Sequence, residues 1–152
     1  MRFLNQECMN IYFCGSIRGG RDLAASYEKM IGMLGIYGKV LTEHLGSDDV
    51  IESKDRILSD QEIHDRDLQW IVESDVLVAE VTVPSLGVGY EIGRAIEMGK
   101  PVLCLFQTAS EYTLSAMIAG SNRVEMEYYR SLEEVQDLFS AFFSSHAPGR
   151  TS

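Results

Sequence analysis

The fold is decided by the stretch Asn10-Ile11-Tyr12-Phe13-Cys14, which continues as Gly15-Ser16-Ile17-Arg18-Gly19-Gly20-Arg21. Its first five residues form a short apolar run typical of a buried β-strand. A helix with apolar residues at helical spacing is predicted from about Arg21 to Ile36. A strand, a glycine-rich turn and a helix in this order begin a βαβ unit, the building block of a parallel sheet.

The same alternation continues along the chain. Ser59 is predicted to start a helix, because Glu62 three residues later completes a capping box. The remaining strands are predicted over 39–42, 75–81, 102–106 and near 123–126, and the remaining helices over 87–98, 114–119 and 132–143. These elements predict a single α/β domain of three layers with a mostly parallel, five-stranded sheet. The patterns leave the strand order open. We expect residues 1–9 to be a flexible N-terminus, residues 10–143 to form the domain and residues 144–152 to be a disordered tail.

Composition excludes several classes of protein. The net charge of −10 argues against binding of a nucleic-acid polymer, although a small phosphorylated ligand needs only local donors and one or two cations. No apolar run approaches the roughly 18 residues that span a membrane, and the N-terminus does not resemble a secretory signal. The three cysteines are scattered without a metal-binding pattern, which favours reduced thiols and a cytoplasmic or nuclear location.

The turn after the first strand is a candidate anion site. Glycines allow a ligand to approach the backbone, the helix N-terminus favours negative charge, and Arg18 and Arg21 add cations. The segment is neither a dinucleotide-binding fingerprint nor a Walker A loop. The alternative is a flexible turn with solvated arginines.

A second candidate segment is Pro84-Ser85-Leu86-Gly87-Val88-Gly89-Tyr90-Glu91, at the end of another strand. Ser85 can offer a hydroxyl, and Glu91 lies in the first turns of the helix that follows. The functional interpretation makes Glu91 catalytic. The alternative is a surface acid that the helix dipole favours.

Other polar residues are ambiguous on spacing alone. Asp67 lies four residues from Ile63 and from Ile71, so it shares an apolar stripe and must be capped, paired or functional. Tyr12 in mid-strand is ordinarily a core residue, but its hydroxyl needs a partner. His44 ordinarily would be an exposed loop residue. Residues 114–118 ordinarily form a helix packing surface.

Two carboxylates at one glycosidic bond suggest a division of labour. One attacks the anomeric carbon, while the other handles protons on the leaving group and then on water. A 2-deoxy sugar suits this route, because loss of the electron-withdrawing hydroxyl eases the build-up of positive charge. The sequence alone does not show that the acids meet.

The segments together resemble the nucleoside 2-deoxyribosyltransferase superfamily, in particular its members that hydrolyse 2'-deoxynucleoside 5'-monophosphates. The resemblance covers roughly residues 10–143 and is carried by six strings in order: 12–21, Leu41-Thr42-Glu43-His44, Asp67-Leu68-Gln69-Trp70, Ala79-Glu80-Val81-Thr82, 84–91 and Leu114-Ser115-Ala116-Met117-Ile118. It implies a Rossmann-like fold and a homodimer with a shared active site. It also implies release of a free base and 2-deoxyribose 5-phosphate, without a metal or an organic cofactor. The implied cellular role is sanitation of the nucleotide pool, including 5-hydroxymethyl-dUMP.

The resemblance also implies roles for individual residues. Glu91 is the nucleophile that forms a covalent glycosyl intermediate, Asp67 is its acidic partner, and Tyr12 orients the nucleophile. The implied substrate-binding residues are Gly15, Ser16, Ile17, Arg18, Gly19, Gly20, Arg21, His44, Ser85, Gly87, Met117 and, from the other subunit, Ser115. Two rivals remain: a deoxyribosyltransferase that passes the sugar to another base, and a nucleotide-binding module without turnover.

Overall fold

The structure is a computed structural model that describes residues 8–17, 21–42 and 58–147. Five parallel strands form one sheet in the order β2-β1-β3-β4-β5. The strands are β1 (Met9–Gly15), β2 (Gly38–Val40), β3 (Val76–Glu80), β4 (Val102–Gln107) and β5 (Glu125–Tyr129). The prediction of an α/β fold with a mostly parallel, five-stranded sheet is confirmed.

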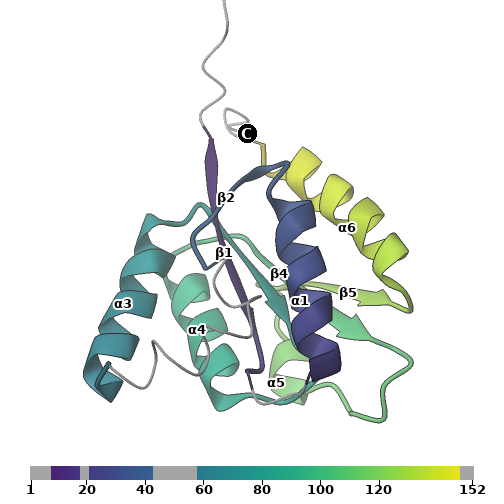
Figure 1. The fold of residues 1–152 in the computed structure, drawn as a ribbon, viewed down its shortest axis with the longest axis horizontal. Helices are drawn as coiled ribbons and strands as arrows, with labels where there is room; N and C mark the ends of the chain where they lie inside the picture. The colour runs from purple at the N-terminus through teal and green to yellow at the C-terminus, as the bar shows by residue number, and fades with distance from the viewer. Residues whose placement is uncertain (1–7, 18–20, 43–57, 148–152) are drawn as a thin grey trace, which may run out of the picture.

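Helices cover both faces of the sheet (Figure 1), which gives the predicted three layers. The helices are α1 (Arg21–Leu34), α3 (Asp60–Glu73), α4 (Leu86–Glu97), α5 (Ala116–Ala119) and α6 (Leu132–Ser145). Side chains of α1 and α6 pack on one face, and side chains of α3 and α4 pack on the other. Among the described helices, none is long and apolar enough to cross a membrane.

The two-residue period of β1 decides which side chains reach which face. Ile11 and Phe13 enter the core under α1 and α6, whereas Tyr12 and Cys14 enter the core under α3 and α4. The face under α3 and α4 therefore receives the only tyrosine hydroxyl of β1. This face carries the candidate site.

The helix that brings Asp67 begins as the sequence predicts. Ser59 is the N-cap of α3, its hydroxyl accepts from the Glu62 backbone, and the Glu62 carboxylate accepts from the Ser59 backbone N–H at 2.7 Å. This reciprocal pair confirms the capping box.

Several element boundaries differ from the prediction by one to three residues; α1, for example, ends at Leu34 and not at Ile36, and β2 spans Gly38–Val40 instead of 39–42. The last strand spans Glu125–Tyr129 instead of 123–126, because Tyr129 is buried in the core and Tyr128 packs its ring edge on Phe106. Two glutamates in this edge strand, Glu125 and Glu127, interrupt the apolar pattern from which a strand is predicted. The helix near residue 114 begins only at Ala116, and α6 continues to Ser145, two residues beyond its predicted end.

Candidate active site

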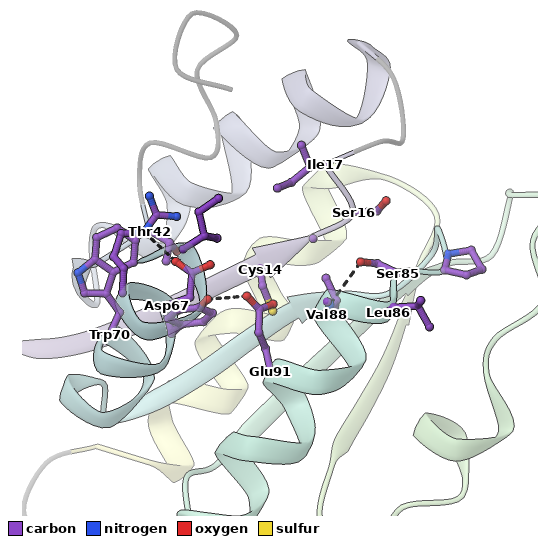
Figure 2. A pocket seen from close by; sticks show the side chains of 16 residues that line it. Cys14, Ser16, Ile17, Thr42, Asp67, Trp70, Ser85, Leu86, Val88 and Glu91 are labelled. Carbon is purple, nitrogen blue, oxygen red and sulfur yellow. Dashed lines mark hydrogen bonds and ion pairs between the residues drawn. The ribbon is translucent and has the colours of Figure 1, made fainter. Parts of the chain in front are cut away.

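A cavity of about 560 Å³ lies beyond the carboxyl end of β1, between α3 and the N-terminus of α4 (Figure 2). Ligands in parallel α/β sheets bind at this edge. The cavity brings together eight predicted site residues from three segments of the chain: β1 with the turn after it, α3, and the start of α4. They are Tyr12, Gly15, Ser16, Ile17, Asp67, Ser85, Gly87 and Glu91.

Tyr12 and Glu91 form a direct contact at the centre of the cavity. The Tyr12 hydroxyl donates a hydrogen bond to Oε1 of Glu91 at 2.6 Å. Tyr12 is almost completely buried, so its position is held by the sheet. The predicted need of this hydroxyl for a partner is thus met by the predicted nucleophile.

Burial dominates the ionisation of Glu91. Desolvation raises its pKa to about 7, and the charge of Asp67 adds to the rise. Hydrogen bonds from the Tyr12 hydroxyl and the Cys14 thiol act in the opposite direction by favouring the carboxylate. Burial also raises the pKa of Tyr12, with a further contribution from the charge of Glu91. Tyr12 therefore stays a hydrogen-bond donor. A carboxyl group that titrates near neutrality in a cavity is typical of catalytic sites.

Asp67 enters the cavity from α3, and Glu91 enters it from α4 (Figure 2). Nε of Arg66 lies 2.9 Å from Oδ1 of Asp67, and each of the two side chains is 24% exposed. The Arg66 guanidinium also lies over the Trp70 ring, 4.8 Å from its centroid. Asp67 is therefore both paired and exposed to the cavity.

The opposite end of the cavity is built from small residues and hydroxyls. Ser85 is the N-cap of α4 and accepts a hydrogen bond from the Val88 backbone N–H at 3.3 Å. Ser16 is buried and follows β1 directly. The hydroxyls and the positive end of α4 make this region suitable for an anion.

Gly15 is required by packing as well as by its place in the site. A Cβ atom at Gly15 would lie 2.6 Å from a ring carbon of Tyr27 in α1. Gly87 has no such contact, since a Cβ atom there would meet only Ser85 Oγ, at 3.8 Å. The sequence prediction of close ligand approach at Gly87 stays a prediction.

Ser115 and Met117 do not line the main cavity of this chain. They border a second cavity of about 530 Å³, which shares Pro84, Ser85, Leu86 and Val88 with the first. Met117 and Leu86 are 84% and 97% exposed. The two cavities thus adjoin at the N-terminus of α4, beside an exposed apolar surface.

The remaining predicted site residues are residues 18–21 and His44. Arg18, Gly19, Gly20 and His44 lie outside the described residues, and Arg21 is described only as the backbone start of α1. Across the described ranges, no group of His, Cys, Asp and Glu side chains is placed to hold a metal ion.

Sequence reasoning missed four cavity residues with clear contacts: Cys14, Thr42, Arg66 and Trp70. Thr42 bonds both the backbone N–H and the carbonyl of Phe13, which ties the end of β2 to β1. Cys14 could have been predicted, because it lies two residues after Tyr12 in β1 and therefore faces the same side of the sheet. The position of Arg66 beside Asp67 gave no periodic signal, because adjacent helix residues point in different directions.

The sequence model of the nucleoside 2-deoxyribosyltransferase family matches residues 11–138. The chain belongs to this family. Its membership confirms the predicted resemblance and places the chain among enzymes of N-glycosidic bond chemistry.

The chain is also similar to relatives that are named as N-hydrolases of deoxynucleotides. The chain is 47% identical to mouse 5-hydroxymethyl-dUMP N-hydrolase over 94% of its own length and 84% of the relative's. It is 49% identical, over 89% of its length and 94% of the relative's, to a Nematostella vectensis protein provisionally named 2'-deoxynucleoside 5'-phosphate N-hydrolase 1.

Solved structures confirm the family's fold in this chain. A Clostridium botulinum CMP N-glycosidase matches with a TM-score of 0.65 at 20% identity, over 88% of this chain and 98% of that one. A 2-deoxyribosyltransferase from Bacillus psychrosaccharolyticus matches with a TM-score of 0.61 at 18% identity, over 88% and 95% of the two chains.

Proposed function

We propose that the protein hydrolyses the N-glycosidic bond of 2'-deoxynucleoside 5'-monophosphates, with Glu91 as the nucleophile. The observation that carries the proposal is the 2.6 Å hydrogen bond from Tyr12 to Glu91, in a cavity that Asp67 also lines. The similarity to the mouse and Nematostella vectensis relatives supports the same reaction, because both are named as N-hydrolases of deoxynucleotides.

In the first step, a Glu91 carboxylate oxygen attacks C1' of the sugar. The bond between C1' and the base nitrogen breaks, its electron pair leaves with the base, and the Asp67 carboxyl group donates its proton to the leaving base. Tyr12 holds one Glu91 oxygen, so the carboxylate is oriented before attack. The product of this step is a covalent glycosyl ester on Glu91.

In the second step, water attacks the same carbon. Asp67 accepts a proton from the water, the bond between C1' and Glu91 breaks, and the carboxylate is regenerated. The final products are a free base and 2-deoxyribose 5-phosphate. Over the two steps, Asp67 gives one proton to the base and takes one from water, so the reaction as proposed needs no cofactor.

The 5'-phosphate is proposed to bind at the N-terminus of α4. Ser16 and Ser85 border this end of the cavity, and the family resemblance assigns the phosphate contacts to residues 15–21 and to Ser85. His44 is assigned to the sugar or base side by the family resemblance only.

A homodimer is proposed to complete the site. Ser115 and Met117 border the adjoining cavity, and exposed Leu86 and Met117 offer an apolar surface beside it. A partner chain packed here would bring its Ser115 toward the phosphate. We place the enzyme in the cytoplasm and nucleus, where it would remove modified nucleotides such as 5-hydroxymethyl-dUMP from the pool.

Product analysis tests the proposal against its two rivals. Purified protein is incubated with a panel of deoxynucleoside 5'-monophosphates, and the free base and sugar phosphate are measured. We expect release of both from the wild type and none from Glu91→Ala, with weak turnover of ribonucleotides. A transferase would exchange bases between deoxynucleosides without needing a phosphate, and a binding module would release no base.

A further inference from the structure

The cavity has two chemically different ends, with Glu91 between them. Asp67 and Trp70 lie on one side of Glu91, and Ser16 and Ser85 lie on the other (Figure 2). A nucleoside monophosphate also has two different ends, since its sugar separates the phosphate from the base. If the phosphate occupies the serine end, the base must extend toward α3.

The α3 end is suited to a flat, partly apolar group. Ile63 and Trp70 line it with an aliphatic and an aromatic surface. Stacking on an aromatic side chain stabilises any base, because every base has a π face. These two residues therefore explain base binding but not base choice.

Among the described residues that line this end, Arg66 is the cation, and it is held in a defined orientation by Asp67 and Trp70. Trp70 supports its guanidinium at 4.8 Å, and Asp67 contacts its Nε at 2.9 Å. A guanidinium has five N–H donors in a planar fork and no acceptor, so it can bind Asp67 and a second acceptor together. Its partial burial limits competition from water.

We infer that Arg66 selects the base by donating to a ring carbonyl. This inference rests on the proposed function. A donor-only group favours bases with a carbonyl at pyrimidine position 4 or purine position 6, as in uracil-type bases and guanine. It disfavours cytosine and adenine, which place an amino donor there.

The test compares Arg66→Met with Arg94→Met. Arg94 is a matched control, because its guanidinium also lies over an aromatic ring, that of Tyr90 at 5.9 Å, but it is exposed and outside the cavity. Measured values are kcat/KM for dUMP against dCMP and for dGMP against dAMP. For Arg66→Met we expect the preference for the carbonyl base to fall about tenfold or more in each pair, since a charged hydrogen bond is lost. Arg94→Met should keep both preferences.

Two results would overturn the inference. An equal loss with all four substrates would mean that Arg66 acts only through Asp67, and unchanged ratios would mean that it does not contact the base. Failure of the proposed function gives a different result, because the wild type would then release no base from any of the four nucleotides.

Discussion

At the scale of single residues, the ionisation of Glu91 is a balance between its surroundings. Burial and the charge of Asp67 favour the neutral acid, whereas Tyr12 and Cys14 stabilise the carboxylate. The resulting pKa of about 7 matters because, in the proposed mechanism, only the carboxylate of Glu91 can attack the sugar. The kcat/KM of the free enzyme should therefore rise as the pH increases through about 7.

Tyr12→Phe tests this balance. The variant loses the hydrogen bond that favours the carboxylate, so the pKa of Glu91 should rise and the ascending limb of the pH profile should move to higher pH. We expect kcat/KM near neutral pH to fall about tenfold. Tyr37→Phe is the control, because Tyr37 packs on Phe143 across the other face of the sheet. A Tyr12→Phe profile that shifts to lower pH, or does not shift, would contradict the assigned role.

At the scale of elements, Ser85 has two functions at the start of α4. Its hydroxyl caps the helix, and it also lines the end of the cavity where the phosphate is proposed to bind. Ser59 caps α3 in a similar way but is exposed and outside the cavity. The two serines therefore separate the effect of helix capping from the effect of substrate binding.

Ser85→Ala and Ser59→Ala should each lower the free energy of unfolding by about 1 kcal/mol, because each removes a helix cap. Only Ser85→Ala should also raise KM for a deoxynucleoside monophosphate, by about tenfold. Thermal or denaturant unfolding and steady-state kinetics check the two expectations. Equal KM values for the two variants would remove Ser85 from the phosphate site.

The elements also show which features the sequence could predict. Strand and helix types followed from hydrophobic periods, and the alternation along β1 placed Tyr12 and Cys14 on one face. The order β2-β1-β3-β4-β5 could not be predicted, because local patterns do not say which strands pair. Spacing alone did not bring Glu91 to Tyr12, since their contact joins residues 79 positions apart. Arg66 was not predicted as a site residue, because it lies outside the apolar stripe of α3.

At the scale of the whole molecule, the proposed dimer combines residues of two chains in each site. Glu91 would come from one chain and Ser115 from the other. A pair of defective variants can then restore each other, because a mixed dimer of Glu91→Gln and Ser115→Asp chains contains one intact site. Ser115→Asp is chosen because its carboxylate would repel the phosphate.

Each variant alone should have low activity, and mixing the two under conditions that exchange subunits should restore a substantial part of it. The control mixture combines Glu91→Gln with Asp67→Asn. In each proposed site, Glu91 and Asp67 come from the same chain. In that mixture, the two defects occupy separate sites and neither site is repaired. Failure of the first mixture, with mixed dimers verified by mass, would show that Ser115 does not act across the dimer.

The central claim is that Glu91 forms a covalent bond to the sugar. The most direct measurement is rapid acid quenching of the enzyme during turnover of a deoxynucleoside monophosphate, followed by mass spectrometry of the whole chain and its peptides. We predict an added 5-phospho-2-deoxyribosyl group on the peptide that contains Glu91, absent in Glu91→Gln and lost as substrate is exhausted. Base release in single-turnover time courses with no adduct at any quench time, or an adduct on another residue, would contradict the claim.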